Sequence, residues 1–398
     1  MKIAVLLKAP WVPGSVDMTE YLRVLQSMGH QSVMVCLDRS FGPPGFDVEA
    51  ASQQTLEDPA FYRRLKLDAC IAFTWLKDHK IIEAMKAAGV RVLLRGDTDG
   101  QISVRHFPAP HFRVRMSAAR GVRQRLAAVK HWTQRYLFEY RLEDRDRVLA
   151  LASADAIVLE TAEAAQNVVH FLRKQRQLDI ASRLHVAPHF VSKDFLEAEV
   201  PVQRHPSVVS IGRWEDVQKN APLLCRTIEL HLSRYPQTSF WIIGPEAGSK
   251  EFIRLTTKYP QVKFLGPQTP AQISKLLAHS QILLSSSRWE GSPLVANEAL
   301  AVGATVVGTP ITAFIDIATR GYGTISRRHS ATSLAEALDT ETKTWIAGKR
   351  DPRAIAAYWR PQLSSRVVIS NLLNLLLNRQ QSHVNPTNTA KQIELISA

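Results

Sequence analysis

The sequence predicts an α/β protein with two doubly wound parallel-sheet domains in tandem. Short runs rich in β-branched residues alternate with segments of helical periodicity, the order typical of parallel strands joined by crossover helices. This alternation stops in a stretch of mixed charge with two prolines, at 197–206, and then starts again. The length of 398 residues also suits more than one domain, at about 150 residues each.

The first half, residues 1–200, is expected to form the first domain. Asp17-Met18-Thr19-Glu20 resembles a capping box, and Gly29 is a typical helix stop, so they predict a helix between them. The other expected elements are strands at 2–7, 31–36, 69–73, 90–95, 154–159 and 183–187, and helices at 78–89 and from about 161.

The second half, residues 201–350, is expected to form the second domain, with the ligand in a cleft between the two domains. The expected strands are 208–212, 239–243, 262–266, 281–286 and 304–307, and the expected helices are 220–234, near 250, from 270 and from 293. Residues 351–378 have an apolar helical pattern. The polar tail, 379–398, is predicted to be disordered.

The formal net charge of +14 is concentrated in one segment. Arg105–Arg147 carries 11 basic and four acidic residues, which is half of the excess. Val122, Leu126, Val129 and Trp132 recur there at helical spacing, so they share one face. Two interpretations stay open: a helix on an anionic membrane surface, or a helix packed on its own domain with a solvated basic face.

The cysteine pattern and the lack of a membrane-spanning pattern predict a cytoplasmic location. The three cysteines, Cys36, Cys70 and Cys225, form no CxxC pair and suit a reducing compartment. The first residues indicate a strand rather than a signal peptide, and the longest uncharged stretch, 299–315, is interrupted by glycine and proline. A peripheral membrane contact stays open.

A helix start in the second half predicts an anion site. Ser292 is a typical N-cap and Pro293 a typical first helical residue, which would leave the amides of Leu294 and Val295 unpaired at the positive end of the helix. Glu290 and Glu298 would bracket a ligand whose phosphate binds there. The alternative is an ordinary capped helix whose two glutamates have no ligand.

Two cations are expected at the same edge of the sheet. The strand 208–212 ends in Gly212-Arg213, and Lys219 follows before the next helix. Ligands of open α/β sheets bind outside the carboxyl ends of the strands. An Arg and a Lys directed at one diphosphate would stabilise a leaving group as its charge grows.

Together these motifs resemble the retaining GT-B glycosyltransferases of family 4, also called group 1. The matching segments are Gly212-Arg213 with Lys219, Ile243-Gly244, Phe264-Leu265-Gly266, Glu290-Gly291-x-Pro293-Leu294 and Glu298-Ala299-Leu300-Ala301-x-Gly303. The resemblance is strong over 207–325 and looser before it. It implies two Rossmann-like domains facing a cleft, a final helix that crosses back to the first domain, and a hexosyltransferase-like enzyme with a nucleotide-sugar donor.

The resemblance also implies roles for individual residues. Arg213 and Lys219 would hold the donor diphosphate, Glu290 the sugar hydroxyls and Glu298 the nucleotide ribose. The donor would also contact the following residues: Gly14, Gly291, Ser292, Pro293 and Leu294. No divalent metal and no cofactor are expected, since the nucleotide sugar is a co-substrate.

The first half departs from the family pattern at one strand end. Many relatives have a histidine after the strand that corresponds to 90–95, where this chain has Arg95-Gly96-Asp97-Thr98-Asp99-Gly100. Asp97 is one replacement, and an ordinary Asp/Gly turn is the alternative. At another strand end, Trp75 is placed to stack on an acceptor, although strand-end aromatics often serve packing alone.

The predicted function is retaining transfer of a sugar to a glycan, lipid or small-molecule acceptor. Front-face attack is favoured over an enzyme nucleophile, because both glutamates have donor-binding roles. The alternative from another class is a non-catalytic, basic GT-B-like protein that binds a polyanion. Anionic lipid at Arg105–Arg147 is the expected anionic partner, and nucleic acid is not expected.

Overall fold

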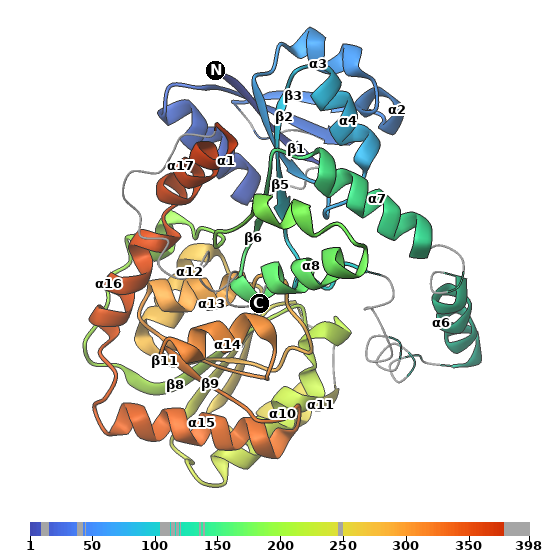
Figure 1. The fold of residues 1–398 in the computed structure, drawn as a ribbon. Coiled ribbons are helices and arrows are strands. Elements are labelled where there is room, and N and C mark those ends of the chain that lie inside the picture. Colours follow the sequence, from blue (N-terminus) through green and yellow to red (C-terminus); the bar gives the residue numbers. More distant parts are fainter. Residues whose placement is uncertain are drawn as a thin grey trace. The chain divides into compact units, whose positions relative to one another are not determined.

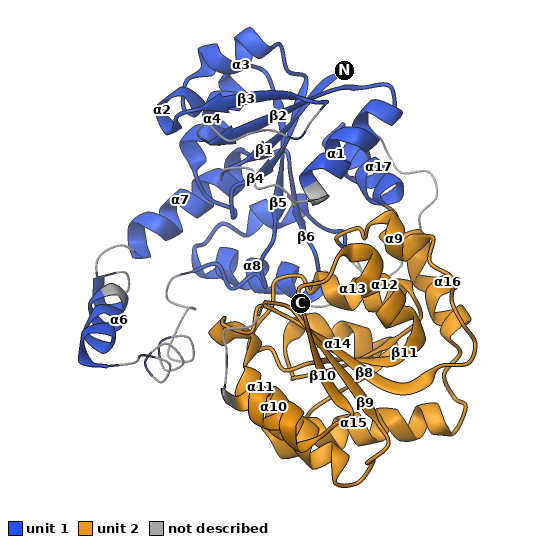
Figure 2. Cartoon of the chain, turned by 180° about the vertical axis from the view of Figure 1, so that it is seen from behind, with its two compact units in different colours: residues 1–188, 365–398 blue, residues 189–364 orange. Residues whose placement is uncertain are grey.

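The computed structural model describes residues 1–8, 16–37, 43, 45–103, 112, 116, 119, 121–134, 137, 140–245 and 250–377. The chain divides into two compact units (Figure 2). The first unit holds residues 1–188 and 365–398, and the second holds 189–364. The predicted tail at 379–398 lies outside the described residues.

The first unit contains a parallel sheet of seven strands in the order β3-β2-β1-β4-β5-β6-β7 (Figure 1). Its strands are β1 (Lys2–Leu7), β2 (Gln31–Leu37), β3 (Asp47–Ala51), β4 (Ala69–Phe73), β5 (Arg91–Gly96), β6 (Ala156–Leu159) and β7 (Leu184–Val186). The strand order reverses between β1 and β4, which makes this the topological switch point. The central strands are buried because helices cover both faces of a parallel sheet.

The helices of this unit are α1 (Val16–Ser27), α2 (Gln53–Leu56), α3 (Pro59–Leu65), α4 (His79–Ala87), α6 (Val122–Gln134), α7 (Tyr140–Ser153), α8 (Ala162–Lys174) and η2 (Leu178–Arg183). The last helix of the described chain, α17 (Ser365–Leu376), packs on α1. Ser365 Oγ donates to Glu20 Oε1 at 2.8 Å and anchors the start of α17.

The second unit contains a parallel sheet of six strands in the order β10-β9-β8-β11-β12-β13. Its strands are β8 (His205–Ile211), β9 (Ser239–Ile243), β10 (Val262–Gly266), β11 (Ser280–Ser285), β12 (Thr305–Gly308) and β13 (Gly323–Ile325). The strand order reverses between β8 and β11. This is again a doubly wound fold.

The helices of the second unit are α9 (Lys193–Leu196), η3 (Val217–Lys219), α10 (Ala221–Leu232), α11 (Lys250–Lys258), α12 (Pro270–His279), α13 (Leu294–Ala301), α14 (Thr312–Thr319), α15 (Ala331–Ile346) and α16 (Pro352–Leu363). One core packs α10, α11 and α15 on the sheet. A second core packs α12, α13, α14 and α16 on its other side.

Residues 352–377 form two helices, where the sequence predicts one continuous segment. The helical backbone stops at Ser364, whose φ and ψ are −68° and 128°. The helix before it, α16, packs on α13 in the second unit, and α17 packs in the first. Within the part of the chain that the structure describes, no helix is long and apolar enough to cross a bilayer.

Candidate functional site

The candidate site lies at the carboxyl edge of the second sheet. β8 and β11 are neighbours and flank the point where the strand order reverses. The chain leaves β8 through Gly212 toward η3, and it leaves β11 toward the segment 286–293. Parallel strands end at the same edge, so these two segments come together although about 70 residues separate them.

Lys219 and Glu290 form a buried ion pair at this edge. Lys219 Nζ lies 2.6 Å from Glu290 Oε1, and the two side chains are only 14% and 9% exposed. Ser287 Oγ donates to the same oxygen at 2.6 Å, and Gln218 Nε2 donates to Oε2 at 2.9 Å. Both oxygens of the carboxylate are therefore bound and fixed in orientation.

Arg288 links the segment after β11 to the segment around η3 through further hydrogen bonds. Its amide donates to the carbonyl of Gln218 at 2.8 Å, and its guanidinium donates to Val217 O at 3.1 Å and to Asn220 Oδ1 at 2.8 Å. Burial lowers the pKa of Arg288. No periodicity or spacing in the sequence points to Arg288, because its partners lie in a distant segment of the chain.

Arg213 does not join this cluster. Its side chain is 72% exposed, and its guanidinium lies 3.6 Å from Asp216 Oδ2. The two predicted cations therefore differ in setting: Lys219 is buried against a carboxylate, whereas Arg213 is exposed to solvent at the same strand end.

The start of α13 differs from the prediction. The N-cap is Pro293, with φ and ψ of −78° and 83° and no side-chain cap, so Ser292 does not cap the helix. The Leu294 amide donates to Ser292 O at 2.9 Å, and it is therefore not free for an anion. The backbone of Pro293 is not helical, which moves the first helical residue to Leu294. Glu298 lies half-buried within α13.

Two predicted residues belong to the first unit. Gly14 lies outside the described residues. Asp97 is exposed directly after β5. The turn that follows is tight: Asp99 Oδ1 accepts from the amide of Gln101 at 3.0 Å, and a Cβ on Gly100 would lie 2.0 Å from the carbonyl oxygen of Ala164.

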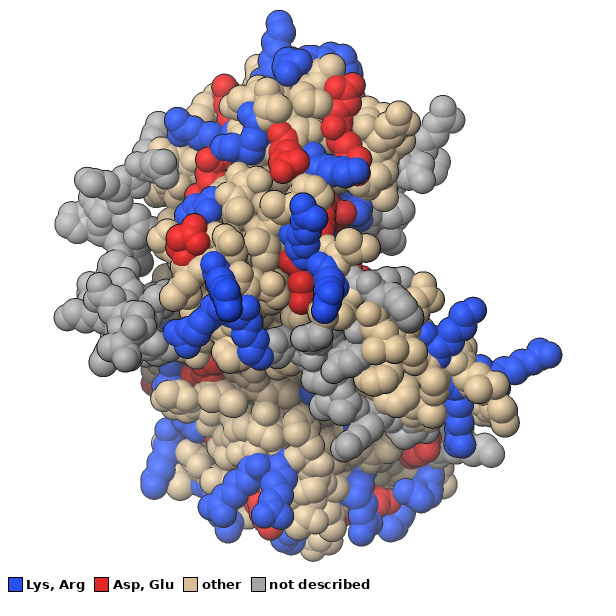
Figure 3. All heavy atoms as spheres, turned by 45° about the vertical axis from the view of Figure 1, so that its right-hand side comes forward, with Lys and Arg blue, Asp and Glu red and all other residues tan. Residues whose placement is uncertain are grey.

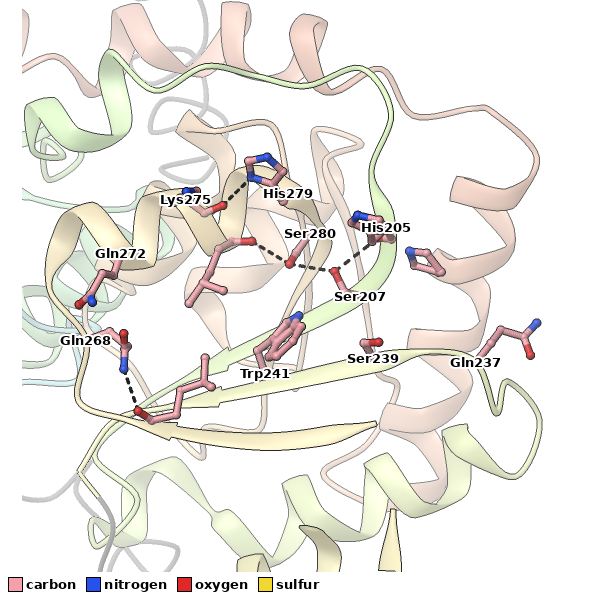
Figure 4. A pocket seen from close by; sticks show the side chains of 13 residues that line it. His205, Ser207, Gln237, Ser239, Trp241, Gln268, Gln272, Lys275, His279 and Ser280 are labelled. Carbon is pink, nitrogen blue, oxygen red and sulfur yellow. Dashed lines mark hydrogen bonds between the residues drawn. The ribbon is translucent and has the colours of Figure 1, made fainter. Parts of the chain in front are cut away.

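A cavity of about 780 Å³ is lined by α12 and by strands of the second sheet, and it extends to Gln268 after β10. Its wall includes His205 and Ser280 at the amino ends of β8 and β11, and residues of α12 (Figure 4). Figure 4 shows Trp241 on the sheet, with Lys275 on the helix. Neither Lys219 nor Glu290 lines this cavity.

Comparison with known proteins identifies similar chains. Residues 205–342 match the family model described as Glycosyl transferases group 1. A phosphatidyl-myo-inositol mannosyltransferase of Propionibacterium freudenreichii subsp. shermanii is 24% identical over 213 residues, 53% of each chain. The match thus spans about half the length of that curated relative.

Solved structures also share the fold. A lipopolysaccharide outer core galactosyltransferase is similar with a TM-score of 0.65 at 14% identity, over 95% of this chain and 100% of that one. A protein from E. coli, described as trehalose-6-phosphate bound with UDP-2-fluoro glucose, has the same TM-score and identity, over 96% and 100%. A glycosyltransferase from Rickettsia africae ESF-5 has a TM-score of 0.65 at 12% identity, over 96% and 99%.

Proposed function

We propose that this chain is a group 1 glycosyltransferase of GT-B fold that transfers a sugar from a nucleotide-sugar donor to an acceptor, with retention of the anomeric configuration. The observation that carries this proposal is the Lys219–Glu290 pair at the carboxyl edge of the second sheet. A cation and a carboxylate held side by side match the two ends of the reacting bond, a diphosphate and a polyhydroxylated sugar.

The proposed roles are those that the family resemblance implies for each side chain. Lys219 binds the leaving diphosphate and stabilises its growing charge, and a fixed cation about 4 Å from a phosphate oxygen contributes on the order of 4 kcal/mol before desolvation. Exposed Arg213 supplies a second contact to the diphosphate. Glu290 accepts hydrogen bonds from sugar hydroxyls, and Glu298 accepts them from the ribose.

The remaining donor contacts are proposed for residues at the start of α13 and for one glycine of the first unit, and the contact of Leu294 does not use its amide, which already donates to Ser292 O. The residues are Gly14, Gly291, Ser292, Pro293 and Leu294. Asp97 is proposed as an acceptor-side carboxylate in place of the histidine that many relatives have. No metal ion and no cofactor are part of this proposal, since Lys219 and Arg213 act on the diphosphate.

Front-face attack is the mechanism we favour. A carboxylate nucleophile needs a free oxygen directed at the anomeric carbon. Both oxygens of Glu290 already accept hydrogen bonds, from Lys219, Ser287 and Gln218. This supports a binding role for Glu290, with the leaving phosphate taking the acceptor proton.

A panel of nucleotide sugars tests the function. The matching donor is expected to raise Tm, because a ligand at about 100 times its Kd stabilises the folded state by about 2.7 kcal/mol. The same donor is expected to be hydrolysed or transferred. The proposal fails if no nucleotide sugar raises Tm and none is turned over.

We further propose a glycolipid or lipid-linked acceptor at a cytoplasmic membrane surface. The curated relative is a phosphatidyl-myo-inositol mannosyltransferase by name, which favours a lipid acceptor. All three cysteines are free and buried, as suits a reducing compartment. The basic helix α6 supports a surface contact, since its apolar residues Val122 and Leu126 are 73% and 62% exposed instead of packed in a core.

Neutralising α6 is expected to weaken vesicle binding. Arg123, Arg125 and Lys130 are exposed beside the apolar residues of this helix. Each basic residue near an anionic surface contributes about 1 kcal/mol. Replacing all three by glutamine is therefore expected to reduce affinity for vesicles that contain phosphatidylserine by roughly 100-fold, as measured by co-sedimentation.

A matched variant controls for net charge. Lys258→Gln, Lys275→Gln and Lys349→Gln together remove three exposed charges from the second unit and should leave vesicle binding close to that of the wild type. Binding that ignores anionic lipid content, or that falls equally in both triple variants, would contradict a contact through α6.

The second candidate function is non-catalytic binding of a polyanion. The net charge of +14 favours it. Among the described residues on the face in Figure 3, however, basic side chains are interspersed with acidic and uncharged ones, and no continuous basic groove is seen. A polyanion-binding function predicts binding that weakens with salt and survives Glu290→Ala, without any turnover of a sugar donor.

A further inference from the structure

The segment after β4 has an unusual backbone. Trp75, Leu76 and Asp78 have φ values of 51°, 57° and 69°, and all three are side-chain-bearing residues in the left-handed region. Only six such residues occur in the described part of the chain, and three of them lie within these four positions. Left-handed backbone is unfavourable for residues with a Cβ, so it persists where the surroundings impose it, commonly at binding sites.

This segment lies at the switch point of the first sheet. β4 is paired with β1, and the strand order reverses between them. The carboxyl edge at such a point is where open α/β sheets bind ligands. The strained backbone therefore occurs where the fold itself favours a binding site.

Residues of α7 hold the segment in this conformation. Arg147 is 9% exposed, and its Nη1 donates to Trp75 O at 2.7 Å. Asp146 accepts from the amides of Asp78 and His79, at 2.6 and 3.1 Å. Burial raises the pKa of Asp146, but hydrogen bonds from the His79 ring and these amides outweigh it, so the pKa is lowered overall. Lys8 at the end of β1 pairs with Asp78.

The result of this arrangement is an exposed indole. The Trp75 side chain is 47% exposed, whereas its neighbours Thr74 and Leu76 are fully buried. The buried neighbours anchor the segment on both sides of Trp75. A tryptophan that served packing alone would bury most of its ring, and its backbone would need no support of this kind.

We propose that Trp75 is a stacking platform for a pyranose ring of the acceptor, with Asp146 and Arg147 as positioning residues. The inference rests on the proposed function, because it names a binding contact of the same enzyme. The C–H face of a saturated sugar ring is apolar and flat enough to cover an indole. The hydroxyl groups at the rim of the sugar ring then reach water or neighbouring side chains.

Fluorine NMR tests this contact without turnover. The chain has eight tryptophans, and the 5-fluorotryptophan resonance that is missing in Trp75→Phe identifies Trp75. Methyl glycosides and disaccharides of glucose, galactose and mannose are the probes, at tens of millimolar. We expect at least one to shift the Trp75 resonance and to leave that of buried Trp214 in place. No shift with any probe would overturn the proposal.

Steady-state kinetics test the role of Trp75 in acceptor binding. The acceptor is the sugar that shifts the Trp75 resonance. Trp75→Ala is expected to raise the acceptor KM at least tenfold, Trp75→Phe is expected to restore part of the affinity, and the Tm rise with donor should persist in both. Trp75→Gly should be at least as thermostable as Trp75→Ala, since glycine adopts this backbone without strain. Tyr358→Ala, which removes a 42% exposed aromatic side chain from the second unit, is the matched control.

Failure of the Trp75 platform and failure of the proposed glycosyltransferase function give different results. If donors raise Tm in the wild type but Trp75→Ala keeps the acceptor KM of the wild type, the platform is wrong and the proposed function stands. If no nucleotide sugar raises Tm and none is turned over, the proposed function is wrong, and the fluorine spectrum still decides whether Trp75 contacts a sugar.

Discussion

Lys219→Ala is expected to lower the rate of sugar transfer by roughly 100- to 1,000-fold, the loss typical of removing one fixed group that stabilises transition-state charge. The ammonium lies at the edge where the donor diphosphate is proposed to bind, 2.6 Å from Glu290 Oε1. Without it, the other cation proposed to bind the diphosphate is Arg213, whose side chain is mostly solvated. Steady-state kinetics with the donor found by thermal shift measure this effect.

The same substitution is expected to reduce stability. Truncating one partner of a fully buried ion pair costs about 3–5 kcal/mol. Here a cost of roughly 1–3 kcal/mol is expected, because Ser287 and Gln218 still donate to the Glu290 carboxylate. Adding Glu290→Gln to Lys219→Ala should recover part of this loss, because it removes the unpaired charge, while activity stays low.

Arg213→Ala is the matched comparison for Lys219→Ala. Its guanidinium is 72% exposed and lies 3.6 Å from Asp216, and exposed pairs of this kind contribute little to folding. We expect weaker donor binding at an unchanged Tm. Transfer at the wild-type rate in Lys219→Ala would contradict the role assigned to this cation, whatever happens to stability.

The sequence predicted the edge of the sheet but not the contacts made there. Gly212 and Ser286 directly follow β8 and β11, so topology alone places both segments at one edge, and this prediction is confirmed. A lysine and a glutamate 71 positions apart have no common spacing, so the sequence assigned them separate ligand roles. The structure instead pairs them directly.

Other differences have local physical causes. The strand β3 (Asp47–Ala51) was missed because four of its five residues are Asp, Glu or Ala, which are uncommon in strands. It lies at the edge of the sheet, where charged residues are tolerated. The break at Ser364 was missed because the apolar periodicity continues from α16 into α17. A side-chain pattern reports which face is buried and does not report one extended residue between two helices.

The left-handed segment at Trp75 could not be predicted, because it contains no glycine or asparagine to announce it. The sequence indicated an aromatic residue after a strand and left packing as the alternative. What separates the two interpretations is tertiary: the Arg147 side chain bonded to the Trp75 carbonyl and the exposure of the ring. Both depend on α7, which lies about 70 residues further along the chain.

Gly244→Ala is expected to cause the largest loss of stability of any single methyl addition at the candidate site. A Cβ on Gly244 would lie 1.9 Å from the carbonyl oxygen of Gly212, and φ at this position is 133°. The two strand ends cannot separate cheaply, because the Gly212 amide and Trp214 Nε1 both donate to Ile243 O, at 3.1 and 2.9 Å. Overpacking combined with the loss of these bonds should cost about 3–5 kcal/mol.

Gly266→Ala separates the close contact from the backbone conformation. Gly266 ends the neighbouring strand with φ of 65°, and a Cβ there would meet nothing within 4 Å. This substitution should cost only the left-handed penalty of about 1–2 kcal/mol. The difference between the unfolding free energies of the two variants, measured with denaturant, therefore reports the energetic cost of the close contact between Gly244 and Gly212.

Since Arg213 follows Gly212 directly, Gly244→Ala should also weaken donor binding, and Gly266→Ala should not. Equal unfolding free energies for both variants would contradict the close approach of the two strand ends, and with it the idea that this contact fixes the position of Arg213.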